Sequence, residues 1–146
     1  MISIELARAL SDSGLDWHPL AGDAFRIDRV ELDDEVFILS DMTVEAHEFS
    51  TGTVLGFNGT TEWALDSVSI EDALWMPRED QLRELLGTAF RSLGRSAEGR
   101  FVVDVDMPAE SDPAAESQTF VADTAADAYA RALLTILDTG GALPAR

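Results

Sequence analysis

The strict alternation of residues 100–107 is the sequence feature that most constrains the fold. Apolar side chains recur at every second position of this segment, at Phe101, Val103, Val105 and Met107. A two-residue period places successive side chains on opposite faces of a strand. Val102, Asp104 and Asp106 fall on the other face. The sequence therefore predicts a strand with one buried face and one half-exposed face.

Three segments show the three- and four-residue apolar spacing of helices, at 3–13, 77–93 and 124–137. Ser3 and Thr124 are suitable N-caps, and Pro77 suits a first helical position. Gly87 interrupts the middle segment at a cost of about 1 kcal/mol. The sequence therefore predicts three main helices, the second of which ends or restarts at Gly87.

Short β-rich runs separated by turn residues occupy 25–27, 35–39, 43–49, 53–57 and 118–122. Tight reversals between the first four predict an antiparallel meander, and 100–107 with 118–122 predicts a hairpin. Residues 36–39 are apolar on both faces, which predicts a central strand covered on both sides. We therefore expect an α+β fold: a mainly antiparallel sheet of five to six strands, meander plus hairpin, covered by three main helices. Residues 1–139 are expected to form a single domain, and 140–146 a frayed tail.

The composition excludes several kinds of chemistry and of partner. The chain has no cysteine and no lysine, and its formal net charge is −18. Thiolate metal sites, disulfides and cysteine nucleophiles are excluded, and so is a lysine-containing phosphate loop. The negative charge disfavours direct binding to nucleic acid or to an anionic membrane. Neither a secretory leader nor an apolar stretch of about 20 residues is present, so we expect a cytoplasmic protein.

Two interpretations of the acidity remain open. The charge either serves solubility, or forms a surface that attracts a basic partner or mimics nucleic acid.

One polar strand face offers a possible metal site. One face of the segment 43–49, together with the residues just before it, carries Asp41, Glu45 and His47. On another strand, Asp104 and Asp106 form an Asp-x-Asp pair. Carboxylates and imidazoles are common ligands of divalent metals. A solvated polar sheet face explains the same pattern. A small metal-assisted hydrolase is therefore an alternative hypothesis only.

The densest polar and aromatic cluster lies between 57 and 63. Asn58-Gly59 suits a turn, and a threonine can cap a following helix. Hydroxyls, a carboxylate and an indole in one loop are also typical of a contact surface for a partner. The candidate partner-binding residues are Asn58, Thr60, Thr61, Glu62 and Trp63.

Three runs of the chain resemble a family of small actinobacterial proteins often labelled "pilus assembly protein". These are residues 33–45, 56–66 and 74–82. The resemblance spans most of the chain, and it implies no catalytic activity or cofactor. A weaker likeness, based on the Trp-x-Pro entry to a helix and an alanine-rich closing helix from Ala125 to Leu137, is to α-β-α sandwich proteins of phage origin. It bears on the fold alone.

These features favour a non-enzymatic acidic binding or regulatory protein that acts through protein–protein contacts. No nucleophile motif of the G-x-S-x-G type is present, and only His18 and His47 could act as imidazole bases. We expect no cofactor and no catalytic residues. Besides the metal-assisted hydrolase, a second alternative is an immunity-type or nucleic-acid-mimic inhibitor of a basic partner, suggested by charge and size.

Overall fold

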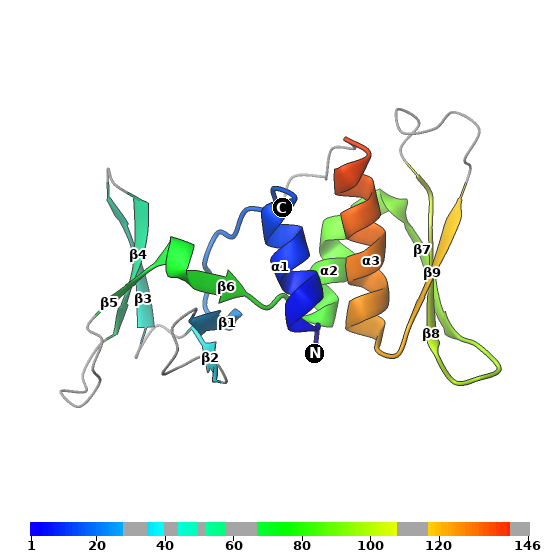
Figure 1. Ribbon diagram of the computed structural model, residues 1–146, viewed down its shortest axis with the longest axis horizontal. Coiled ribbons are helices and arrows are strands. Elements are labelled where there is room, and N and C mark those ends of the chain that lie inside the picture. Colours follow the sequence, from blue (N-terminus) through cyan, green and yellow to red (C-terminus); the bar gives the residue numbers. More distant parts are fainter. Residues whose placement is uncertain (28–34, 40–43, 50–51, 58–66, 108–116, 141–146) are drawn as a thin grey trace. The chain divides into compact units, whose positions relative to one another are not determined.

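The computed structural model describes residues 1–27, 35–39, 44–49, 52–57, 67–107 and 117–140. The chain divides into two compact units, one comprising Met1–Leu15 with Pro77–Arg146 and the other comprising Asp16–Met76 (Figure 1). All three α-helices of the described residues belong to the first unit. The expectation of a single domain over residues 1–139 stays a prediction, and residues 141–146 lie outside the described residues.

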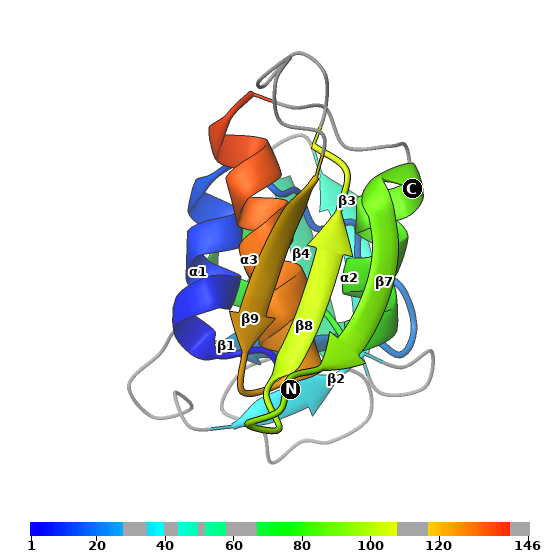
Figure 2. The ribbon, with the colours of Figure 1, turned by 90° about the vertical axis from the view of Figure 1, so that its right-hand side faces the viewer.

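The unit that contains Met1 is built from three helices and one antiparallel sheet. Its elements are α1 (Ile4–Asp12), α2 (Glu79–Leu86), the 3₁₀ turn η2 (Gly87–Ala89), β7 (Phe90–Arg95), β8 (Phe101–Val105), β9 (Gln118–Ala122) and α3 (Ala125–Asp138). The strand order is β7-β8-β9, and both pairings are antiparallel. The helices lie together on one side of this sheet, and α3 contacts β8 and β9 directly (Figure 2).

Helix ends in this unit follow the expected capping chemistry. The side chain of Ser3 accepts the Leu6 N–H at the start of α1, and the Thr124 hydroxyl accepts the Asp127 N–H at the start of α3. The main-chain N–H of Ser3 donates to Oδ1 of Asp127 at 2.7 Å, which joins the starts of the two helices. The predicted N-caps Ser3 and Thr124 are therefore confirmed, whereas the prediction that Pro77 is a first helical residue is wrong, because Arg78 is the N-cap of α2 and the helix begins at Glu79.

The core of the unit forms where α3 meets the sheet. Val103 and Val105 of β8 are fully buried, as are Leu133 and Tyr129 of α3. The Tyr129 ring packs against Phe90 with 5.7 Å between ring centroids. The alternation of residues 101–107 is thereby confirmed as a strand with one buried face.

Residues 16–76 contain two further three-stranded antiparallel sheets. The first has the order β2-β1-β6 and comprises β2 (Val36–Ile38), β1 (Ala24–Ile27) and β6 (Ala73–Trp75). The second has the order β3-β4-β5 and comprises β3 (Val44–Phe49), β4 (Gly52–Phe57) and β5 (Ser67–Ser69), followed by the 3₁₀ turn η1 (Ile70–Asp72).

The core of the β2-β1-β6 sheet is aromatic. Phe25 and Ile27 are fully buried, and Trp17 stacks on Trp75 with 6.5 Å between ring centroids. The Trp17 indole N–H donates to Oδ2 of Asp23 at 2.9 Å, and the Leu20 N–H donates to the same oxygen. Asp23 is only 1% exposed, so its carboxylate fixes the loop before β1 through buried hydrogen bonds.

The α+β class and the three helices are confirmed, whereas a single sheet of five to six strands is not. The described strands form three separate three-stranded sheets. The prediction that residues 36–39 form a central strand is wrong for the described sheet, because β2 pairs with β1 alone and Ile38 is 56% exposed. The apolar run is explained by its other face, where Phe37 and Leu39 join the core around Phe25.

The second helix ends at Gly87, as predicted, but the predicted restart of a helix after Gly87 is wrong. Gly87 has a positive φ of 54°, and residues from Phe90 onward form β7. The register against β8 shifts between Phe90 and Ser92, so Arg91 is one extra residue in β7, as in a β-bulge. Phe90 and Leu93 therefore pair with Val105 and Val103 on the same face although they are three residues apart, a spacing that imitates a helix.

Candidate binding surface on the β7-β8-β9 sheet

The β7-β8-β9 sheet has one face that the helices leave open. Because side chains alternate across a strand, this face carries Val102 and Asp104 of β8, and Asp106 follows directly after the strand. Asp104 lies opposite Ser92 of β7 and opposite Thr119 of β9. Polar side chains from all three strands therefore meet on this face.

Asp104 is the centre of a hydrogen-bonded cluster. The Thr119 hydroxyl donates to its Oδ1 at 2.6 Å, and the Ser92 hydroxyl donates to its Oδ2 at 2.9 Å. The bond from Thr119, followed by that from Ser92, lowers the pKa of the Asp104 carboxyl below its ordinary value. The cluster thus holds a permanently ionised carboxylate at neutral pH.

Next to this cluster lies an ion pair over the same face. Arg91 Nη1 is 3.1 Å from Oδ1 of Asp106, and both side chains are exposed. Together Arg91, Ser92, Asp104 and Ser117 line an open depression of about 450 Å³. Its walls are polar, which suits contact with hydrated groups better than with an apolar ligand.

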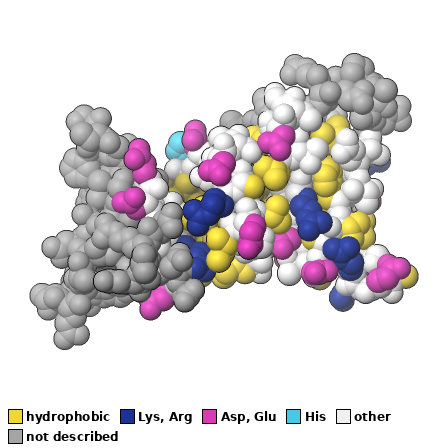
Figure 3. Space-filling view, in the orientation of Figure 1, with side chains coloured by type: hydrophobic (Ala, Val, Ile, Leu, Met, Phe, Trp, Pro, Cys, Tyr) yellow, Lys and Arg dark blue, Asp and Glu magenta, His cyan; other side chains and the backbone are white. Residues whose placement is uncertain are grey.

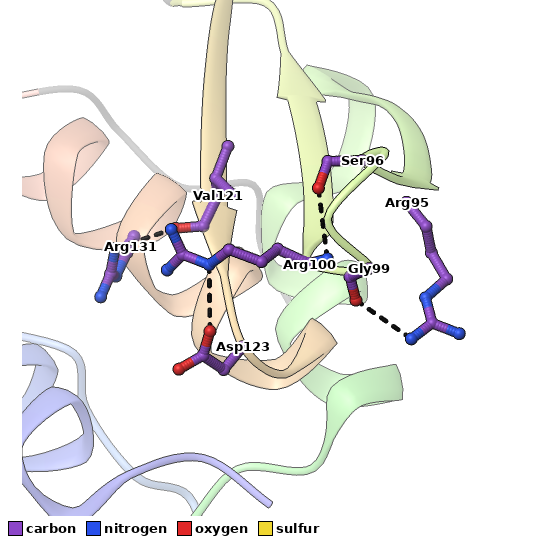
Figure 4. Close-up of polar contacts among 7 residues, drawn as sticks. All are labelled: Arg95, Ser96, Gly99, Arg100, Val121, Asp123 and Arg131. Carbon is purple, nitrogen blue, oxygen red and sulfur yellow. Dashed lines mark hydrogen bonds and ion pairs between the residues drawn. The ribbon is translucent and has the colours of Figure 1, made fainter.

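Arginines also surround the turn that joins β7 to β8 (Figure 4). Arg95 donates to the Gly99 carbonyl at 3.0 Å, and its guanidinium lies 4.9 Å from the centre of the Phe101 ring. Arg100 forms an ion pair with Asp123 at 3.0 Å. Arg95 has no ion pair among the described residues, so its charge is uncompensated there.

The outer edge of β7 is exposed over most of its length, including Leu93. The Ser96 N–H donates to the Arg100 carbonyl, which marks a hydrogen-bonded pair between the two strands. Hydrogen-bonded pairs alternate with non-hydrogen-bonded pairs along an antiparallel ladder, so the next hydrogen-bonded pair is Gly94 with Val102. The main-chain groups of Leu93 and Arg95 therefore point away from β8, toward the outer edge.

The charge of this region differs from that of the whole chain. Residues 90–100 contain three arginines and one glutamate, whereas the chain carries 28 acidic and 10 basic residues. Figure 3 shows arginine side chains among the acidic ones on the face in view. Arg91 and Arg100 form ion pairs with Asp106 and Asp123, whereas Arg95 has no ion pair among the described residues.

The candidate residues from the loop cannot be placed in this surface. Asn58, Thr60, Thr61, Glu62 and Trp63 all lie outside the described residues. Their role in partner binding stays a prediction.

The predicted metal-binding residues are distributed over both units. Asp41 lies outside the described residues, and Glu45 and His47 occupy β3 opposite Gly56 and Val54 of β4. Asp104 and Asp106 belong to the other unit, where each has its own hydrogen-bond partners. Within the described ranges, no group of three or more His, Asp or Glu side chains is positioned to hold a metal ion.

Sequence reasoning missed Arg91, Ser92 and Leu93 as surface residues because it assigned residues 77–93 to a helix, and it singled out no role for Arg95. A signal for the hairpin was present. Gly99, which has a positive φ of 81°, follows a short polar stretch that closes a turn before the alternating strand. A turn at this point requires a strand on its N-terminal side.

No helix in the described part of the chain has the length and apolar character needed to span a membrane. A scan against protein-family models gives no match, and neither the curated proteins nor the solved structures contain a significant match.

Proposed function

We propose that this chain is a non-enzymatic protein-binding module whose contact surface is the open face and the β7 edge of the β7-β8-β9 sheet. The observation that carries this proposal is Leu93. Its side chain lies on the same face of the sheet as the buried Val103, yet it is 37% exposed at a strand edge with outward main-chain groups. Exposed strand edges are sites at which proteins pair with other chains.

The chemistry of the open face supports binding rather than catalysis. A general base works best when its pKa is near the working pH, whereas the pKa of Asp104 is lowered by its two hydroxyl donors. The Ser92 hydroxyl is therefore paired with a weak proton acceptor and is a poor nucleophile. Hydroxyls, a carboxylate and the Arg91–Asp106 ion pair are typical of the polar rim of a protein interface.

The net charge of −18 bears on the kind of partner. At physiological salt, charges separated by more than about 8 Å are strongly screened, so the net charge acts mainly on the rate of encounter. A partner that is basic overall would be attracted, and its binding would weaken as salt is raised. We therefore propose a basic partner protein.

The test is a pull-down from the cells that produce the chain, at low and at high salt. Leu93→Asp places a charge in the proposed surface, and Leu20→Asp is the matched control because Leu20 is 56% exposed in the other unit. We expect a basic protein to be recovered at low salt by the wild type and by Leu20→Asp, and lost with Leu93→Asp. Equal recovery by both variants would contradict the proposed surface.

A further inference from the structure

We propose that β7 binds an extended segment of the partner as an additional strand, antiparallel to β7, with an acidic residue beside Arg95 and an apolar residue beside Leu93. This inference rests on the proposed function and specifies the segment that docks. Strand addition obtains affinity from main-chain hydrogen bonds and specificity from alternate side chains. β7 offers both outward main-chain groups, at Leu93 and Arg95, and alternate side chains, those of the same two residues.

The two edges of the sheet differ in a way that supports this assignment. On β9, Val121 pairs with Val102, whose main chain bonds to β7, so the main-chain groups of Val121 point outward. Arg131 donates to the Val121 carbonyl at 2.8 Å and occupies that edge (Figure 4). At β7, no side chain of the described residues is bonded to the outward groups of Leu93 and Arg95. On β9 the outward carbonyl of Val121 is therefore occupied by the protein's own arginine, whereas the outward groups of Leu93 and Arg95 are not bonded to any described side chain.

The side chains of β7 define the residues that a docked strand should carry. Leu93 and Arg95 lie on one face, opposite Val103 and Phe101. Residues directly opposite in a strand pair have Cβ atoms about 5 Å apart, and opposite charges there are stabilising. An apolar side chain beside Leu93 would cover its exposed surface, and a carboxylate beside Arg95 would compensate its charge. In an antiparallel strand, the acidic residue comes first and the apolar residue follows two positions later.

The negative net charge of the chain does not prevent this local contact. An acidic residue opposite Arg95 would have its Cβ about 5 Å from the Cβ of Arg95, inside the screening length of about 8 Å. On the other face, Asp104 accepts hydrogen bonds from Ser92 and Thr119, and Asp106 forms an ion pair with Arg91. A partner that is basic overall can therefore present an acidic residue in the strand that docks.

A second copy of the chain is a less suitable occupant of the β7 edge. If Leu93 of two copies were paired across a two-fold axis, Arg95 of each copy would lie opposite Arg91 of the other. Like charges directly opposite each other are destabilising. Each copy also carries a net charge of −18, which opposes association.

The experiment uses a capped peptide of eight residues, all threonine except for one glutamate and, two positions later, one valine. Binding to the ¹⁵N-labelled full chain is followed by amide chemical shifts. We expect the largest shifts at Leu93 and Arg95. Replacing the glutamate by lysine, or Arg95 by alanine, should weaken binding about 3-fold because an opposite-charge cross-strand pair is lost.

Hydrogen bonding by the main chain is tested first by modifying the peptide, so that this part of the test needs no variant of the protein. N-methylation of the valine removes a donor that faces β7 and should weaken binding about 10-fold. N-methylation of the threonine between glutamate and valine is the matched control, since its N–H points away from β7. We expect Leu93→Pro to weaken binding similarly, because it removes an outward N–H at a position where an edge strand tolerates proline.

Four outcomes would overturn strand addition. Shifts confined to Ser92, Asp104 and Thr119 would place the contact on the open face, which would leave the proposed protein-binding function standing. Equal effects of the two N-methylations would show that no strand ladder forms. A concentration-dependent dimer in analytical ultracentrifugation that Leu93→Pro abolishes would assign the edge to a second copy. A peptide that does not bind would overturn the inference, whereas the pull-down tests the proposed function separately.

Discussion

Replacing Asp127 by alanine should destabilise the helical unit more than any other change of an exposed or half-buried carboxylate. The Asp127 carboxylate accepts the Ser3 N–H at 2.7 Å across 124 residues of sequence. It also lies in the first turn of α3 and at the N-terminus of α1, where a negative charge interacts favourably with both helix dipoles. Its removal therefore separates two helices at their starts.

The magnitude follows from these contacts. A hydrogen bond to a charged group contributes about 1.5–3 kcal/mol, and a charge at a helix N-terminus about 0.3–1 kcal/mol. Because the bond is only partly buried, the lower part of the first range applies, and Asp127→Ala should lower the free energy of unfolding by about 2–3 kcal/mol. Asp127→Asn keeps an acceptor and loses the charge, so about 1 kcal/mol is expected.

The assay is urea unfolding followed by circular dichroism at 222 nm, since the described helices all lie in this unit. Asp138→Ala is the matched control: Asp138 also links α3 to α1, through the Ser13 hydroxyl at 3.0 Å, but this contact is exposed. It should change stability by no more than about 0.5 kcal/mol. Equal effects of Asp127→Ala and Asp138→Ala would refute the reasoning.

The same variant tests the expectation of a single domain. Every tryptophan of the chain lies within residues 16–76, so tryptophan fluorescence follows the second unit. If residues 1–139 unfold cooperatively, Asp127→Ala lowers the urea midpoint of both signals equally. A lower midpoint in circular dichroism alone would show that the units unfold separately.

Three further predictions concern single polar groups. Thr119→Val should raise the pKa of Asp104, measured by ¹³C NMR. A lowered pKa stabilises the fold only at pH values above that pKa, so the wild type loses stability as the pH falls through it. Thr119→Val should lose less stability over the same pH range. Asp23→Ala should cost about 2–3 kcal/mol and shift the emission of Trp17, since two partly buried hydrogen bonds to a charged acceptor are lost. Burial raises the pKa of Tyr129, the only tyrosine, so absorbance at 295 nm should show ionisation above the ordinary pH of about 10, with stability falling as the pH rises through that pKa.

Local sequence patterns correctly predicted the elements in which the apolar period is regular and, for helices, the capping residue indicates the same start. The strand from Phe101 and the helix capped by Thr124 were correctly placed, because the former has an uninterrupted two-residue period and the latter a cap followed by a regular apolar stripe. The pairing of strands was harder to predict from the sequence. Whether Val36–Ile38 is central or peripheral depends on which segments lie beside it, and apolar residues on both faces do not settle that.

The proposed contact surface at β7 was missed for a related reason. The extra residue Arg91 moves Leu93 onto the face of Phe90, so the apolar residues of a strand acquire a helical spacing. A period counted along the sequence assumes one residue per ladder position, and a bulge breaks that assumption. Strands that contain bulges near functional edges are therefore the elements that periodicity is least able to assign.

The arginines of the chain show why the sign of the net charge is a poor guide to a contact. Arg131 covers an outward carbonyl on β9, Arg91 compensates Asp106, and Arg95 lies on Phe101 with no ion pair among the described residues. Each acts within about 5 Å, a range at which the remaining acidic residues contribute little at physiological salt. In the proposed complex, the net charge would affect how often the partners meet, whereas the local arrangement at β7 would determine which strand remains bound.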